Sequence, residues 1–333
     1  MGSRSSALFL VPLLLAAAPQ GVFEGQQDVG AVLHSGSVEY DPGTGTYTVS
    51  GSGDNMWFAA DAFHFVWKKM SGDVTLSADI SILGEAGDPH RKAVLMIRQT
   101  LDPDSAYADV ALHGNGLTSL QVREENGDAT HEIESNITAP RRVSIIKQGD
   151  IFRIVVDGQM AGGSMRANVT GTYYMGIGVC AHKKDFVQKA AFSNVATGKP
   201  DLSAPKLYST IETINVASTD RRVVYVTEGR LTAPTWTPDG NMIEFMQDGH
   251  PRSVSAAGGQ PSGATGAEPE SYLSESPDGK QLAWVSRSDG EMMLRAMSFA
   301  DKTIRVLAKG KFDRPAWSTD SRRLVFVSYQ MIN

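Results

Sequence analysis

Three related segments near the C-terminal end of this 333-residue chain constrain its fold more than any other feature. The copies span residues 232–249, 271–290 and 313–330, and each places a turn sequence before a short apolar strand. Trp236, Glu275 and Trp317 occupy one equivalent position, which gives spacings of 39 and 42 residues. A period near 40 residues, built from a turn and a strand, is typical of a β-propeller blade.

The turn of each repeat carries a second shared position, whose members are Asp239, Asp278 and Asp320. An aspartate caps such a turn, and the glycine that follows in two copies, Gly240 and Gly279, accommodates a positive φ angle. Residues 207–333 hold about three blades at ~40 residues each, whereas closed propellers have four to eight. We therefore expect an incomplete propeller that leaves strand edges open or pairs with another chain.

Residues 21–197 show a different pattern of short strands separated by turn residues. In residues 73–82 the apolar side chains Val74, Leu76, Ala78 and Ile80 alternate with polar ones, which marks a strand with one buried face. Nine further segments are predicted as strands, and no window has a convincing helical period. The predicted fold class is all-β: a jelly-roll β-sandwich followed by the incomplete propeller.

Composition excludes several classes of function. The single cysteine, Cys180, excludes an internal disulfide framework and a zinc site built on several thiolates. The net charge of −6 offers no electrostatic attraction to nucleic acid. Apart from the first 20 residues, no stretch approaches the 18 apolar residues that indicate a transmembrane helix.

Residues 1–20 have the features of an export signal. A basic residue, Arg4, precedes a 12-residue apolar run, and small alanines follow that run where a cleavage site would lie. The alternative is a buried N-terminal strand or helix. We expect a signal peptide at 1–20, a sandwich at 21–197, a linker at 198–206 and repeats at 207–333, in a periplasmic or secreted protein.

Particular runs of residues resemble two known families. The runs FHFVWKKMSGDVTLSADI, KAVLMIRQTLDPDSAYADVALHGNGLTSLQVRE and MGIGVCAHKKDFVQKAAFSNV resemble the concanavalin-A-like and laminin-G-like jelly rolls of bacterial secreted proteins. The repeats resemble the TolB-like motif W-S-P-D-G-x-x-I-x-F, although Glu275 replaces the tryptophan and Thr319 with Ser321 replaces the Pro and Gly. The first resemblance implies a fold that often binds carbohydrate, and the second implies protein interaction.

Two tryptophans are candidates for stacking on a sugar ring. Trp57 and Trp67 belong to a cluster of aromatic residues within residues 57–67, and an aromatic ring can pack against the apolar face of a sugar. The alternative is that most of this cluster forms the core of the sandwich.

Polar residues on neighbouring predicted strands form a second candidate ligand site: Arg98, Asp109, His113 and Arg123. If the strands pair consecutively, these side chains line one face, and an Arg–Asp pair can hold sugar hydroxyls. The alternative is ordinary ion pairing at the surface.

Catalysis and metal binding have weaker support. A glycosidase needs two carboxylates beside the scissile bond, and the E-x-D-x-x-E pattern of the resembling glycosidases does not occur. Glu132 and Glu134 resemble ordinary hairpin charges. No cofactor is expected, the metal remains undetermined, and a structural calcium ion at the sandwich edge is left open.

The leading hypothesis is an exported, non-catalytic binding protein. The sandwich would bind carbohydrate or a cell-envelope polymer, and the repeats would bind a protein. The alternatives are a glycoside hydrolase that uses acidic residues of the sandwich, a scaffold like that of the Tol envelope system, and a purely structural module.

Overall fold

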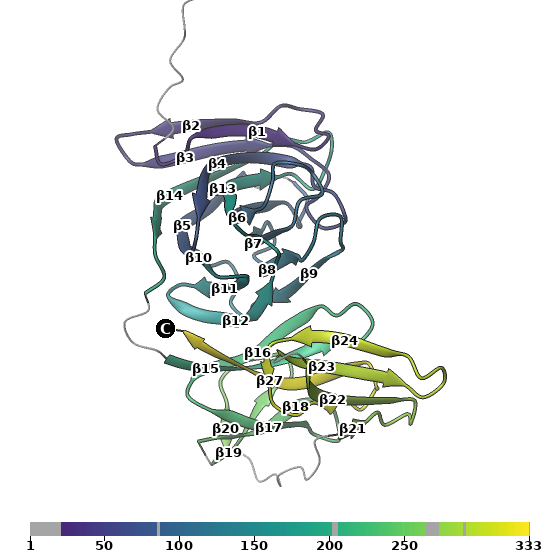
Figure 1. Ribbon diagram of the computed structural model, residues 1–333. Coiled ribbons are helices and arrows are strands. Elements are labelled where there is room, and N and C mark those ends of the chain that lie inside the picture. The colour runs from purple at the N-terminus through teal and green to yellow at the C-terminus, as the bar shows by residue number, and fades with distance from the viewer. Residues whose placement is uncertain are drawn as a thin grey trace, which may run out of the picture.

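The computed structural model describes residues 21–84, 87–201, 206–248, 250–263, 273–288 and 291–332. Every regular element in these residues is a β-strand, so the all-β prediction is confirmed. The strands form a sandwich and, beside it, a group of three smaller sheets (Figure 1). The predicted signal at 1–20 lies outside the described residues, as do residues 202–205 of the predicted linker. The described part contains no helix long and apolar enough to cross a membrane.

Two antiparallel sheets make up the sandwich. In spatial order, the strands of the first sheet are β1 (Gly25–Val29), β4 (Phe63–Ser71), β13 (Thr172–Cys180), β6 (Lys92–Arg98), β7 (Tyr107–His113), β8 (Thr118–Arg123) and β9 (Thr130–Glu134). Those of the second are β12 (Gln159–Arg166), β11 (Ile151–Val156), β10 (Arg142–Gln148), β5 (Val74–Leu83), β14 (Gln188–Gly198), β3 (Thr46–Gly51) and β2 (Ser37–Asp41).

The apolar side chains that the two sheets turn toward each other form the sandwich core. On β5, the predicted alternation places Val74, Leu76, Ala78 and Ile80 in this core. Strand β12 was not predicted from the sequence, because Gly162 and Gly163 interrupt it and glycine weakens a strand. The outer side of β12 packs against β15, β16 and β27 of the C-terminal sheets, and these contacts replace the packing that the glycines lack.

The C-terminal part contains three blade-like sheets. The first has β17 (Leu231–Trp236), β18 (Met242–Gln247), β19 (His250–Ser255) and β20 (Ser262–Gly263), and the second has β21 (Leu273–Glu275), β22 (Gln281–Ser288), β23 (Glu291–Ser298) and β24 (Ile304–Lys309). The third combines β16 (Arg221–Glu228), β15 (Lys206–Asn215), β27 (Arg323–Ile332) and the short strands β25 (Lys311–Phe312) and β26 (Ala316–Trp317).

The third sheet joins segments from opposite ends of the repeat region. Strand β15 pairs with β27 from Lys206↔Ile332 to Asn215↔Arg323, although more than 100 residues separate the two strands. One apolar cluster packs the third sheet against the first, and another packs it against the second. In the described residues no apolar cluster joins the first sheet to the second, which fits the prediction of an incomplete propeller.

The repeat turns share one geometry. Gly240, Gly279 and Ser321 have φ angles of 70°, 66° and 60°, so the third copy holds a serine where the others hold the expected glycine. In each turn a hydroxyl donates to the aspartate two residues later, as Ser276 Oγ does to Asp278 Oδ1 at 2.6 Å. The repeat tryptophans differ, since Trp317 is buried and donates to Ser274 O at 2.8 Å, whereas Trp236 is half-buried.

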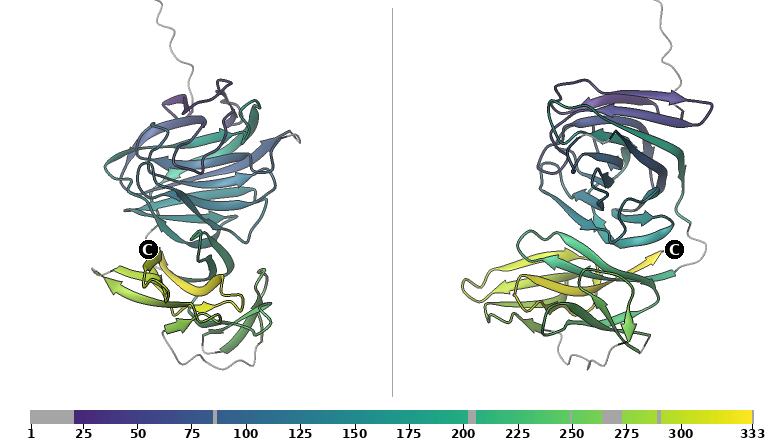
Figure 2. Two further views of the ribbon diagram at one scale, coloured as in Figure 1. Left: turned by 90° about the vertical axis from the view of Figure 1, so that its right-hand side faces the viewer. Right: turned by 180° about the vertical axis from the view of Figure 1, so that it is seen from behind.

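The sandwich and the C-terminal sheets are connected by more than the chain between them. Strand β16 pairs in parallel with β9 at Arg221↔Ile133 and Arg222↔Glu134, so the first sheet of the sandwich continues into the third blade-like sheet. The buried pair Glu212–Arg221 lies against Gly163, where an added Cβ would come within 2.4 Å of both side chains. Strand β12 contacts β15, β16 and β27, and both views of Figure 2 show the teal end of the sandwich next to the C-terminal sheets.

Candidate functional site

The outer face of the first sheet, turned away from the core, carries buried polar residues beside a second apolar cluster that includes Met96 and Tyr107. Directly paired residues of neighbouring antiparallel strands share a face, and Asp109 pairs with Met96 on β6 and with Gln121 on β8. By the same alternation, the four residues that the sequence nominated lie on this outer face: Arg98, Asp109, His113 and Arg123. All four are at least 96% buried, so the alternative of surface ion pairs is wrong.

Residues 53–62 cover part of this face, and two arginines hold them there. Arg123 donates from Nη2 to Asp61 Oδ1 at 2.7 Å and from Nη1 to Oδ2 at 3.0 Å. Arg98 Nη2 lies 3.3 Å from the same carboxylate. The remaining donors of Arg123 go to backbone carbonyls, including those of Phe58 and Ser105. The two arginines therefore hold the segment in place and offer no surface to a ligand.

Asp61 was not found by sequence reasoning. It lies in an irregular segment, where no periodicity places a side chain on a face, so only the folded chain reveals its partners. The Arg–Asp pair that the sequence suggested does not involve Asp109, because the carboxylate that binds both arginines belongs to Asp61.

Asp109 and Lys92 are buried close to each other on the same face. Lys92 on β6 lies directly opposite His113 on β7, and Asp109 lies four residues before His113 on the same face. Lys92 Nζ donates to Asn55 Oδ1 and Gln121 Oε1, both at 3.2 Å. Within the described residues neither Asp109 oxygen has a hydrogen-bond partner. Burial raises the pKa of Asp109 well above its ordinary value, and the nearby Lys92 opposes this shift.

Beside this buried group lies a pocket of about 180 Å³. Its lining combines one indole, three imidazoles and several hydrogen-bonding groups: Asn55, Trp57, His90, Lys92, His113, Leu117, Gln121, Glu132 and His182. We call it the Trp57 pocket. Lys92 Nζ lies 5.6 Å from the centroid of the Trp57 ring, and this cation–π contact orients the indole.

His113 presents a defined hydrogen-bonding atom to the Trp57 pocket. Its Nδ1 lies 3.1 Å from the Leu117 carbonyl, which can only accept, so Nδ1 carries the hydrogen and Nε2 is the acceptor. Burial, followed by the nearby Lys92 charge, lowers the pKa of His113 to about 3. The ring is therefore neutral at physiological pH.

Glu132 lies in the pocket wall rather than on an exposed hairpin, which corrects the sequence interpretation. It pairs with Gln121, whose Nε2 donates to Glu132 Oε2 at 3.3 Å. Burial is the largest cause of the raised pKa of Glu132. Both residues could have been found from the alternation, because Gln121 is two residues from Arg123, and Glu132 lies opposite Gln121.

The two nominated tryptophans have different surroundings. Trp57 lines the pocket, whereas Trp67 on β4 packs edge-to-face on Tyr174 with ring centroids 5.0 Å apart. Phe63 and Phe65 are buried, but in a second apolar cluster with Met56 rather than in the core between the two sheets, where the packing alternative placed them. The neighbouring Phe58 is 68% exposed and was not nominated.

No group of three or more His, Cys, Asp or Glu in the described residues is arranged to hold a metal ion. His182 lies near Asp88, with 3.3 Å between Nδ1 and Oδ1. Cys180 is buried as a small apolar residue, and burial raises the pKa of its thiol to about 11.

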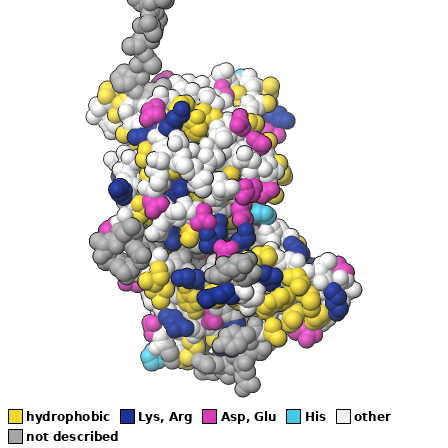
Figure 3. Space-filling view, viewed as in Figure 1, with side chains coloured by type: hydrophobic (Ala, Val, Ile, Leu, Met, Phe, Trp, Pro, Cys, Tyr) yellow, Lys and Arg dark blue, Asp and Glu magenta, His cyan; other side chains and the backbone are white. Residues whose placement is uncertain are grey.

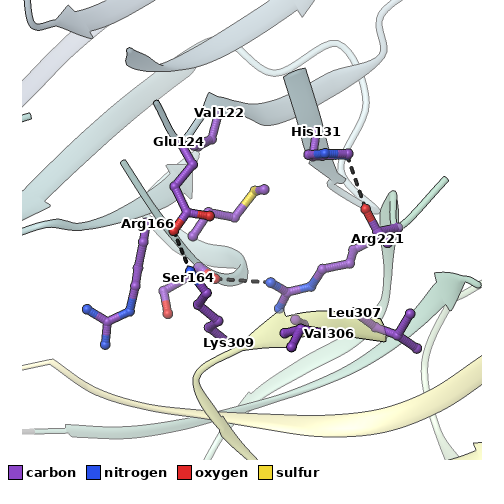
Figure 4. A pocket seen from close by; sticks show the side chains of 12 residues that line it. Val122, Glu124, His131, Ser164, Arg166, Arg221, Val306, Leu307 and Lys309 are labelled. Atoms are coloured by element: carbon purple, nitrogen blue, oxygen red, sulfur yellow. Dashed lines mark hydrogen bonds and ion pairs between the residues drawn. The ribbon is translucent and has the colours of Figure 1, made fainter. Parts of the chain in front are cut away.

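The junction between the sandwich and the C-terminal sheets contains further hollows. One of about 220 Å³ lies among β8, β9, β12, β16 and β24 (Figure 4). Lys309 Nζ crosses it to Glu124 Oε1 at 2.6 Å, and Arg221 Nη1 donates to Ser164 O at 3.0 Å. These contacts, drawn as dashed lines in Figure 4, tie β24 to the residue after β8 and β16 to β12 across the junction.

Comparison with known proteins yields no match to a protein-family model and none to a curated protein. Among solved structures, the carbohydrate-binding module CBM66 from Bacillus subtilis is similar at 19% identity and a TM-score of 0.37, covering 54% of this chain and 98% of that module. A β-1,3-1,4-glucanase from a mouse hindgut metagenome is similar at 13% identity and a TM-score of 0.34, covering 49% and 83%.

One further similarity is weaker. TolB from Acinetobacter baumannii matches at 16% identity and a TM-score of 0.17, covering 40% of this chain. The chain spans 39% of that protein. At TM-scores below 0.5, none of these similarities carries a functional conclusion.

Proposed function

We propose that this chain is an exported, non-catalytic binding protein whose sandwich holds a carbohydrate or cell-envelope polymer at the Trp57 pocket. The observation that carries the proposal is the half-buried Trp57 indole, which lies beside both hydrogen-bond donors and hydrogen-bond acceptors. The three blade-like sheets would provide the surface for a protein partner. The comparisons are consistent with the proposal and do not carry it.

A sugar ring has an apolar face and a rim of hydroxyls, and the Trp57 pocket offers a complement to both. The indole provides the apolar surface, while His113 Nε2 and the Glu132 carboxylate accept hydrogen bonds from hydroxyls. Asn55 and Gln121 already bind Lys92 and so have fixed orientations. Binding to such prearranged groups costs little side-chain entropy.

Glycoside hydrolysis is the alternative that the geometry allows us to test. Glu132 lines the pocket, but the second carboxylate of the face, Asp109, is completely buried beside it. A two-carboxylate mechanism needs both groups at the scissile bond, so the geometry favours binding over turnover. Release of reducing sugar from a bound polysaccharide, lost in Glu132→Gln, would favour the hydrolase instead.

The binding proposal is tested by measuring affinity for a panel of soluble polysaccharides and oligosaccharides with the whole chain. We expect at least one glycan to bind, and Trp57→Ala to weaken that binding at least tenfold because the stacking surface is lost. The matched control is Trp67→Phe, which changes the tryptophan packed on Tyr174 outside the pocket. No glycan binding, or equal affinity in Trp57→Ala, would overturn the proposal.

Export and the protein partner need separate tests. Fractionation of cells that produce the full chain, followed by N-terminal sequencing, should find the protein outside the cytoplasm without its first 20 residues or so. Recovery of an intact N-terminus in the cytoplasm would contradict export. For the partner, crosslinking through the blade-like sheets should capture a defined protein, and a Tol-like scaffold would yield envelope components.

A further inference from the structure

A larger pocket of about 920 Å³ lies at the junction of the sandwich and the C-terminal sheets. Strands β11 and β12 line one side, and β23, β25 and β27 line the other. It shares Ser164, Arg166 and Lys309 with the smaller hollow of Figure 4. We call it the junction pocket; it is distinct from the Trp57 pocket, with which it shares no lining residue.

Six of the sixteen residues that line the junction pocket are basic: Arg153, Arg166, Arg230, Arg287, Lys309 and Lys311. Among its described lining residues, Glu291 is the one carboxylate. In the space-filling view, Lys and Arg side chains gather where the sandwich meets the C-terminal sheets (Figure 3).

Known ion pairs neutralise part of this charge. Arg166 pairs with Asp150 at 2.6 Å and with Glu291 at 2.8 Å, and Lys309 pairs with Glu124 at 2.6 Å. In the described part of the chain, the six basic residues of the lining thus form ion pairs with three carboxylates in total. The pocket therefore retains an excess of positive charge.

Arg153 is the group whose environment is incomplete. Its neighbours on β11, Phe152 and Ile154, belong to the sandwich core, so Arg153 points to the opposite face, toward the junction. It is 5% exposed, and its Nη1 donates to Gln148 Oε1 at 3.1 Å. Its Nε has no partner, and no described carboxylate forms an ion pair with it.

A buried guanidinium without a carboxylate is costly, because burial removes water that nothing then replaces. Burial lowers the pKa of Arg153, which reflects the same missing compensation. Gln330 faces the same pocket with its Oε1 unpartnered, while its Nε2 donates to Gly162 O at 2.6 Å. Arg153 Nε and Gln330 Oε1, one unpartnered polar atom on each of two opposite walls, indicate that an external group completes this site.

We propose that the junction pocket binds a small ligand with two or more oxyanion groups, carboxylate or phosphate, which bridges the sandwich and the C-terminal sheets. Guanidinium groups match the geometry of both oxyanions. The volume lies within the range of pockets for small organic ligands. Leu207, Met292 and Met331 add an apolar wall, which favours a ligand with a carbon framework over a bare ion.

The test measures binding of two acidic probes to the full chain by calorimetry, at low and high salt. Digalacturonate represents acidic sugars, pyrophosphate represents phosphate groups, and neutral digalactose is the control ligand. We expect at least one acidic probe to bind, with affinity that falls as salt screens the charges, and digalactose not to bind. Binding of digalacturonate alone identifies the carboxylate source, and binding of pyrophosphate alone identifies the phosphate source.

Two variants assign the site. Arg153→Gln removes the buried cation, and Arg230→Gln removes an exposed one whose loss leaves the core intact. Each substitution should lower the affinity for the acidic probe at least tenfold. Lys189→Gln, on the exposed side of β14 away from the pocket, should change nothing. Absence of binding by both acidic probes, equal affinity in Arg230→Gln, or equal affinity for digalactose would overturn the proposal. Because Trp57→Ala should leave this binding unchanged, failure here is distinguishable from failure of the proposed function.

Discussion

Asp61 and Arg123, which lie 62 residues apart, form a completely buried ion pair in which two guanidinium nitrogens bind two carboxylate oxygens. This pair joins the irregular segment 53–62 to strand β8. It therefore positions Trp57, whose indole depends on the conformation of that segment.

We predict that Asp61→Asn destabilises the sandwich by about 3–5 kcal/mol, because it leaves Arg98 and Arg123 as buried charges without a carboxylate. Urea unfolding checks the magnitude. The control is Glu228→Gln, which breaks an ion pair with Lys206 whose side chains are more than half exposed and should cost less than about 1 kcal/mol. Equal losses in the two variants would contradict the role assigned to Asp61.

The neutral His113 predicts a pH-dependent stability. Its pKa is about 3 in the folded chain, below the ordinary value of 6.5, so the unfolded chain binds the proton first as pH falls. The free energy of unfolding should be insensitive to His113 above pH 6.5 and should fall by about 2 kcal/mol on going to pH 5. Urea unfolding at several pH values measures this loss.

His113→Asn isolates that contribution, because the asparagine amide can still donate to Leu117 O. The groups that face His113 are Lys92, His90 and His182, and they remain in both proteins. The raised pKa values of Asp109 and Glu132 act in the opposite direction and also remain. The difference between the two proteins should therefore grow as pH falls from 6.5 to 5; a constant difference would show that His113 titrates normally.

The repeat turns predict a cost for any side chain at the positive-φ position. Gly279 has a φ of 66°, and an added Cβ would meet no atom closer than 3.9 Å, so Gly279→Ala isolates the backbone strain. We expect a loss of about 1 kcal/mol in thermal or urea unfolding. Gly198→Ala, where the Cβ meets nothing and φ is not positive, should have almost no effect. Similar losses in both would contradict the turn geometry.

The third repeat shows how the chain tolerates the same strain. Ser321 has a φ of 60°, and its Oγ accepts a hydrogen bond from Asp278 N at 3.1 Å. This bond connects the third turn to the second and offsets part of the backbone cost. The departure from glycine that the sequence showed therefore has a structural reason.

Local pattern in the sequence determined most strands of the sandwich, the shared face of four nominated residues and the repeat turns. Alternation along a strand places side chains by sterics alone, which is why Arg98, Asp109, His113 and Arg123 share a face. Asp and Gly at the turns act through their own backbone geometry, so they too were predictable.

Tertiary structure alone decided which polar groups are neighbours. Asp61 reaches Arg123 through an irregular segment, and β15 pairs with β27 across the whole repeat region. Arg153 and Gln330 come to line one pocket because β27 packs beside β12. Such contacts depend on how distant segments pack. No local propensity encodes them, because burial and charge compensation arise only when the sheets assemble.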